Sequence, residues 1–125
     1  MFIIDPTTQS ISASRGDSYG FEISIYSGDR MNPSDYKFQD DDVLYMALQE
    51  PNQVFEDAIL KKKFTKDDLI DDSTIKVLFT PEDTMYLLPG LYYYQFKLVR
   101  AEKDDEGNNL VDTIIPLTEF YIEEG

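Results

Sequence analysis

The chain has 125 residues with no cysteine and no histidine, and its 25 acidic against 11 basic side chains give a formal net charge of −14. Without Cys or His it has no disulfide, no thiolate nucleophile, no zinc site of the usual kind and no imidazole base for a serine or cysteine triad. The negative charge repels phosphate backbones and anionic lipid head groups, which argues against nucleic acid and membranes as partners. The length and the 42% of hydrophobic residues suit one packed domain over residues 1–125.

The first ten residues contain no basic segment, and their apolar run Phe2-Ile3-Ile4 is cut short by Asp5-Pro6. This pattern differs from that of a signal peptide, and no stretch of the sequence has the length of a membrane-spanning helix. We therefore expect a soluble product that is made in the cytoplasm and has no signal peptide.

Apolar and polar residues alternate along most of the chain, and no segment keeps a helical stripe for ten residues, so the pattern predicts an all-β domain. Strands are expected at residues 10–14, 19–25, 43–49, 54–64, 74–79, 91–100, 110–115 and 118–122. The loop between the second and third of these holds one short extended piece, at residues 36–38. Seven or eight short strands with a turn about every ten residues are typical of an immunoglobulin-like antiparallel β-sandwich.

Three polar segments are explained by turns and strand edges and do not require a binding function. The tripeptide Arg15-Gly16-Asp17 matches an integrin-binding motif, but three residues match by chance, and we interpret it as a turn. The basic run Lys61–Lys63 is expected on an exposed edge strand, where lysine discourages pairing with another strand edge. A link at 65–73 has the composition of one helical turn.

The candidate cation sites are three acidic clusters, which are Asp40–Asp42, Asp67-Asp68 with Asp71-Asp72, and Asp104–Glu106. Calcium binds six to eight hard oxygen ligands, and the segment Asp104–Asn108 offers enough of them. None of the acidic clusters follows the spacing of a helix–loop–helix calcium site, so a solvated hairpin tip is the default interpretation and calcium a weak possibility. Clustered loop carboxylates do not indicate the pair that glycoside hydrolysis requires either. The sequence predicts no catalytic site and no cofactor.

A corner is predicted where the chain enters its strongest strand. Thr80 is a helix cap and Pro81 suits the first helical position, so we expect a short helical turn near 81–87 that ends at Pro89-Gly90. A tyrosine hydroxyl from the emerging strand then bonds back to this turn, as in a tyrosine corner, with Tyr92 the first candidate and Tyr94 the second. The residues assigned to the corner are Asp83, Thr84, Pro89, Gly90, Tyr92 and Tyr94.

The same region carries a family resemblance. The pieces Glu82-Asp83-Thr84, the pattern L-x-P-G-x-Y-x-Y from Leu87 to Tyr94, and a closing Phe120-x-Ile122 resemble small phage and prophage structural proteins. The likeness is to the N-terminal domain of siphophage baseplate upper proteins, and its outline extends over most of the chain. Helical and receptor-carrying regions follow this domain in the larger baseplate proteins, and we do not expect them in this chain.

The resemblance implies a virion or baseplate component that is made in the bacterial cytoplasm and acts through protein contacts without enzymatic activity. Its partners would be other virion proteins or further copies of the same chain. The alternative is a small carbohydrate- or protein-binding β-sandwich module, because the chain has nine tyrosines and sugars stack on aromatic faces. Tryptophan, the favoured stacking residue, is absent from the sequence.

Overall fold

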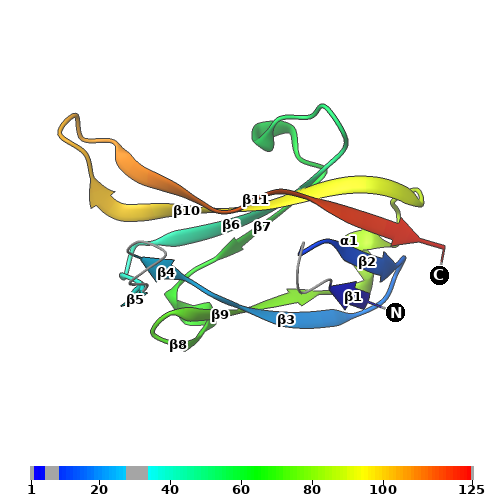
Figure 1. Cartoon of the computed structure of the whole chain (residues 1–125), viewed down its shortest axis with the longest axis horizontal. Coiled ribbons are helices and arrows are strands. Elements are labelled where there is room, and N and C mark those ends of the chain that lie inside the picture. The colour runs from blue at the N-terminus through cyan, green and yellow to red at the C-terminus, as the bar shows by residue number, and fades with distance from the viewer. Residues whose placement is uncertain (1, 5–8, 28–33, 125) are drawn as a thin grey trace.

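Two β-sheets form the framework of this computed structural model, which describes residues 2–4, 9–27 and 34–124. In the described chain the larger sheet has the strand order β1 (Phe2–Ile4), β2 (Ile11–Ser14), β11 (Asn109–Glu123), β10 (Gly90–Lys103), β6 (Val43–Gln49) and β7 (Leu60–Phe64). The smaller sheet has the order β3 (Tyr19–Ser24), β9 (Thr74–Phe79) and β8 (Leu69–Asp71). Figure 1 shows the two sheets as layers, one above the other.

The prediction of an all-β sandwich is therefore confirmed. Strands β11, β10, β6 and β7 lie in one sheet and β3, β9 and β8 in the other, the division found in immunoglobulin-like sandwiches of the variable type. One described pair departs from the expected antiparallel order, because β2 runs parallel to β11 from Phe120 to Glu123. Two further described strands, β4 (Tyr26–Ser27) and β5 (Ser34–Asp35), pair with each other in a separate two-stranded sheet.

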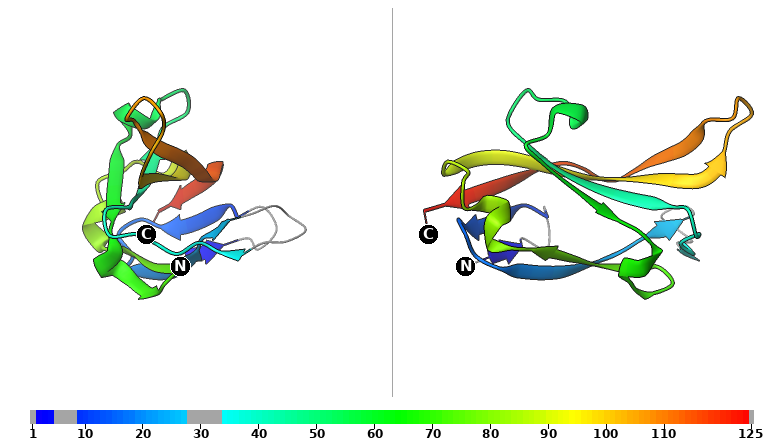
Figure 2. Two further views of the ribbon diagram at one scale, coloured as in Figure 1. Left: turned by 90° about the vertical axis from the view of Figure 1, so that its left-hand side faces the viewer. Right: turned by 180° about the vertical axis from the view of Figure 1, so that it is seen from behind.

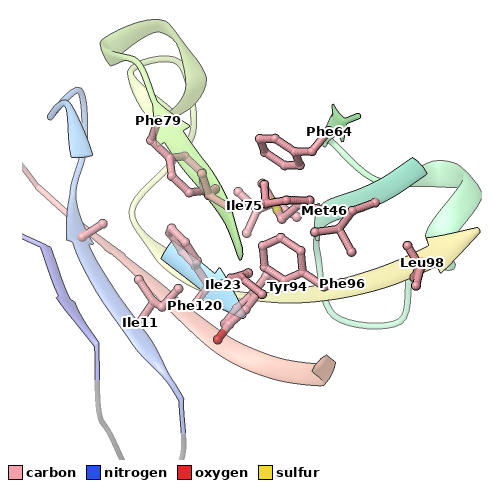
Figure 3. Packing of buried hydrophobic residues seen from close by; sticks show 14 of the residues in the cluster. Ile11, Ile23, Met46, Phe64, Ile75, Phe79, Tyr94, Phe96, Leu98 and Phe120 are labelled. Atoms are coloured by element: carbon pink, nitrogen blue, oxygen red, sulfur yellow. The ribbon is translucent and has the colours of Figure 1, made fainter. Parts of the chain in front are cut away.

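The core lies between the sheets and is rich in aromatic side chains. Phe96 and Phe120 are fully buried. The ring centroid of Tyr94 is 6.0 Å from that of Phe96, and Phe79 lies 5.9 Å from Phe120. Figure 3 shows these rings packed with Ile23, Ile75 and Met46. Each fully buried side chain of this size contributes about 1.5–3 kcal/mol of hydrophobic stabilisation. The sequence left the facing of β6 open because both of its faces are apolar; Leu44, Met46 and Leu48 are buried, and Ala47 of the other face is buried as well.

Four expected elements differ from the structure. The strand predicted at 54–64 is confined to β7, because Phe55–Asp57 forms a 3-10 turn, η1, whose Phe55 ring packs edge-on to Tyr45. The helical turn near 81–87 is α1 (Pro81–Thr84) alone, and the link at 65–73 contains both a 3-10 turn, η2 (Lys66–Asp68), and β8. The short extended piece falls at β5 rather than at 36–38.

The strands expected at 110–115 and 118–122 are one continuous strand, β11. Pro116 does not divide it, because the pairing with β10 shifts register between Ile115 and Thr118. A proline also removes no ladder hydrogen bond on a strand side that has no neighbour. Among the described residues, β2 covers that side only from Phe120 onward.

The hairpin of β10 and β11 is longer than the rest of its sheet. Its pairing with β6 ends at Val99 and Val43, whereas β10 and β11 stay paired as far as Lys103 and Asn109. Residues 100–112, which we call the hairpin arm, therefore extend past the sandwich (Figure 2). No described helix is long and apolar enough to cross a membrane.

Candidate functional site

The corner before β10 begins with α1. The Asp83 carboxylate accepts a hydrogen bond from the Thr80 N–H at 2.8 Å, and Pro81 occupies the start of the helix, where a missing N–H costs nothing. The same carboxylate pairs with the Lys62 ammonium at 2.7 Å. Asp83 therefore joins the corner to strand β7, and Lys62 is the one member of the lysine run that points inward.

Tyr92 bonds back to the turn that precedes its own strand. Its hydroxyl donates to the Leu88 carbonyl at 2.6 Å, and the ring is nearly fully buried. This is the contact of a tyrosine corner. Burial raises the pKa of Tyr92 above its usual value. Between the two residues, Gly90 has a φ of +152°, which side chains other than glycine rarely adopt, so the entry into β10 depends on a glycine.

Tyr94, the second corner candidate, contacts a different part of the chain. Its hydroxyl donates to the Gln9 carbonyl just before β2. Its ring lies among core aromatics, and burial raises the pKa of its hydroxyl to about 12. Of the two candidates, Tyr92 is thus bonded to the corner, while Tyr94 connects β10 to the N-terminal segment.

Thr84 joins the corner to the Arg15-Gly16-Asp17 turn. Its buried hydroxyl accepts a hydrogen bond from the Gly16 N–H at 2.9 Å. Arg15 in turn binds the Glu124 carboxylate at 2.6 Å and donates to the Leu87 carbonyl. The tripeptide is a turn, as the sequence predicted, and its arginine is occupied within the chain.

Immediately after α1, the corner exposes a cluster of large apolar side chains. Tyr86 is 82% exposed and Leu88 77%, and Met85 between α1 and Tyr86 is 42% exposed. We call Met85, Tyr86 and Leu88 the apolar turn. Large apolar side chains exposed close together in the chain are candidates for a protein contact. Pro89, which follows them, is exposed as well.

A buried carboxylate anchors the base of the hairpin arm. Asp42 is fully buried, and its Oδ1 accepts a hydrogen bond from the Ala101 N–H at 2.6 Å. Its Oδ2 accepts from the Tyr36 hydroxyl at 2.5 Å and from the Gln39 N–H at 2.8 Å. Burial, together with the adjacent Asp42 carboxylate, raises the pKa of Tyr36 well above its usual value. The bond from Ala101 attaches the start of the arm to the segment before β6, and the bonds from Tyr36 and Gln39 hold the Asp42 carboxylate in place within that segment.

Arg100 adds a second attachment at the same place. Its Nε donates to the Asp112 carboxylate at 2.6 Å across the hairpin, and its guanidinium carbon lies 5.5 Å from the centroid of the Tyr36 ring. The arm is therefore held at its base by Asp42 from one side and crosslinked by Arg100. Sequence reasoning assigned Asp42 only to an acidic triplet, and the apolar turn received no functional interpretation.

A groove separates the edge of β3 from the free side of β11. Its volume is about 480 Å³. The lining is mostly apolar and comes from Gln9, Ile11, Phe21, Glu22, Ile23, Ser24, Tyr26, Tyr94, Thr113, Ile114 and Ile115. Its floor is part of the core, because Ile11, Ile23 and Tyr94 are buried residues of the sandwich.

The proposed cation segment forms the tip of the hairpin arm. The Asp104 carboxylate accepts hydrogen bonds from the N–H groups of Glu106 and Asn108, both at 2.9 Å, and Gly107 has a φ of +85°. These bonds give the tip its turn geometry. In the parts of the chain that the structure describes, no three carboxylates come together as a metal ion requires.

Comparison with known proteins adds no family. A scan against protein-family models finds no match, and a search of curated proteins finds no similar sequence. A functional proposal for this chain therefore rests on its own residues and their arrangement.

Proposed function

We propose that this chain is a non-enzymatic structural accessory protein of a phage or prophage virion, acting through protein–protein contacts in a tail or baseplate assembly. The observation that carries the contact role is the apolar turn, where Tyr86 and Leu88 are largely exposed beside a corner that hydrogen bonds hold in place. A contact surface on a rigid element loses little conformational entropy on binding. The virion assignment rests on the resemblance of the segment from Glu82 to Tyr94.

The corner supports this proposal because the resembling residues also build the contact surface. Asp83 and Tyr92 fix the ends of the turn by hydrogen bonds, and the exposed Met85, Tyr86 and Leu88 lie between those ends. A virion component would bury such side chains against a neighbouring subunit. Burial of one large apolar side chain contributes about 1.5–3 kcal/mol.

Mass spectrometry of purified particles, after prophage induction in the source organism, tests the proposal. We expect the chain in intact particles at a fixed stoichiometry. The double variant Tyr86→Ser/Leu88→Ser should be lost from particles, whereas Ile70→Ser, an exposed apolar residue of the smaller sheet, should be retained. Absence of the wild-type chain from intact particles would refute the virion role.

A second candidate, a carbohydrate- or protein-binding module, is favoured by the groove between β3 and β11. It is large enough for a small ligand and has the aromatic side chains of Phe21, Tyr26 and Tyr94 in its lining. Isothermal titration against a panel of oligosaccharides, with Tyr26→Ala as the variant, tests this role. Binding that Tyr26→Ala weakens, in a chain missing from particles, would place this candidate first.

A further inference from the structure

Two strand edges of the larger sheet are open in the part of the chain that the structure describes. Strand β7 is the last strand on one side. On the other side, β11 pairs with β2 only from Phe120 to Glu123, which leaves its segment from Asn109 to Glu119 without a neighbour there. Open edges present unpaired N–H and C=O groups that a further strand can bind.

The two edges carry opposite charge. Strand β7 holds three lysines and no carboxylate. Lys61 and Lys63 are exposed and make no ion pair with a described carboxylate, although the Lys61 ammonium lies 4.4 Å from the centroid of the Phe55 ring. The hairpin arm has five carboxylates against two cations, and Asp105 and Glu106 at its tip are exposed.

These charges select which edges pair. Two β7 edges repel each other through their lysines, and two arms repel each other through their carboxylates. Only the pairing of an arm with a β7 edge brings unlike charges together. In a chain with a net charge of −14, the basic edge is also a local exception on an otherwise acidic molecule.

The arm projects beyond the strand that flanks it and is held at its base. A two-stranded ribbon alone is marginally stable in water, and the arm extends beyond β6 (Figure 1). Asp42 and Arg100 hold its base in one direction, as the bonds to Ala101 and Asp112 show. An arm that is fixed at its base loses less conformational entropy when it binds.

We propose that the hairpin arm of one copy adds to strand β7 of a second copy, with its acidic tip against Lys61 and Lys63. This inference deepens the proposed function by naming a second copy as the partner. The arm and β7 are different surfaces of the same chain, so the contact is head-to-tail. Such a contact closes into a ring or continues as a filament.

Charge reversal tests the pairing. We choose Asp105→Lys/Glu106→Lys for the arm and Lys61→Glu/Lys63→Glu for β7, and measure association of the full chain at physiological salt by analytical ultracentrifugation. The wild type should form concentration-dependent oligomers. Each reversed variant alone should associate more weakly, because it places like charges together at the contact. It should need about tenfold higher concentration or more to form the same oligomers.

Mixing the two reversed variants gives the decisive result. A basic arm then meets an acidic β7 edge, and an acidic arm meets a basic one, so the mixture should associate as the wild type does. Lys76→Glu, on β9 of the other sheet, is the control and should leave association unchanged. Far-ultraviolet circular dichroism of each variant establishes that the fold is retained.

A monomeric wild type at high concentration, or a mixture that does not recover association, would overturn the inference. So would an equal loss of association in Lys76→Glu. A chain that is monomeric in solution but present in particles at fixed stoichiometry would contradict the arm contact and leave the proposed virion role standing. The particle experiment therefore tests the virion role, and the association experiment tests the arm contact independently of it.

Discussion

The buried carboxylate of Asp42 offers the sharpest test of how the hairpin arm is held. The substitution Asp42→Asn keeps the side-chain shape but replaces one acceptor oxygen by an NH₂ group. That NH₂ then faces a donor, since the carboxylate accepts from the Tyr36 hydroxyl, the Gln39 N–H and the Ala101 N–H. The tyrosine hydroxyl can rotate to accept, but a backbone N–H cannot.

The expected cost follows from these three bonds. A hydrogen bond to a charged group contributes about 1.5–3 kcal/mol, and a buried donor left without a partner costs about 1–3 kcal/mol. Losing at least one bond and weakening the others should lower the free energy of unfolding of Asp42→Asn by about 3 kcal/mol. For a chain of this length, the midpoint of thermal unfolding should fall by roughly 10–15 °C.

Urea unfolding followed by circular dichroism measures this loss. The matched control is Asp41→Asn, because Asp41 is the adjacent, exposed aspartate and the same charge is removed. We expect that control to lie within about 0.5 kcal/mol of the wild type. Faster hydrogen exchange at the Ala101 amide in Asp42→Asn would locate the effect at the base of the arm. Equal stability of the two variants would refute this account of the arm.

Three further results are expected. Tyr92→Phe should lose about 1 kcal/mol of stability in urea unfolding, because it removes the bond to the Leu88 carbonyl, which water can then satisfy; a neutral result would mean that this corner contact adds nothing. Thr84→Val should lose about 1–2 kcal/mol of stability in the same assay, since its methyl group leaves the Gly16 N–H unpaired. Unchanged stability would mean that water satisfies that N–H. Stability should also fall as pH rises from about 10 toward 12, because burial raises the pKa of Tyr94 to about 12 and unfolded tyrosines release their protons first. Urea midpoints at pH 9 and 11 measure this fall in stability. The fall should be smaller in Tyr94→Phe, and an equal fall in that variant would contradict the burial argument.

Local sequence patterns predicted much of the sandwich. The apolar run at 43–49 placed strand β6 with the bounds that the structure shows, although its two apolar faces left its facing open. The break at Pro89-Gly90 and the following Tyr92 predicted a corner from residues close together in the chain. Patterns of this kind succeed because side chains alternate across a strand, and caps and turns depend on nearby residues.

Other features depended on residues far apart in the chain. Asp42 looked like one more loop aspartate, but Ala101, 59 positions later, buries it and donates to it. Pro116 predicted a break between two strands, whereas β11 continues through it and its pairing with β10 shifts register at that point. The sequence predicted a strand from Val54 onward, yet the Phe55 ring packs against Tyr45. The ammonium groups of Lys61 and Lys97 lie over the face of the same ring.

The sequence alone therefore determined the all-β class, most strand positions and the turn at the corner, since each follows from alternation or from neighbouring residues. The lysine run also predicted that β7 is an edge strand, as it is in the described chain. Only the tertiary structure decided that β2 lies parallel to β11, that the hairpin arm extends beyond β6, and that no described strand pairs with β11 before Phe120 on the side of β2. Strand order and the burial of a charge are set by contacts between distant segments. Hydrophobic periodicity specifies which face of a strand is buried, but it does not specify the neighbouring strand.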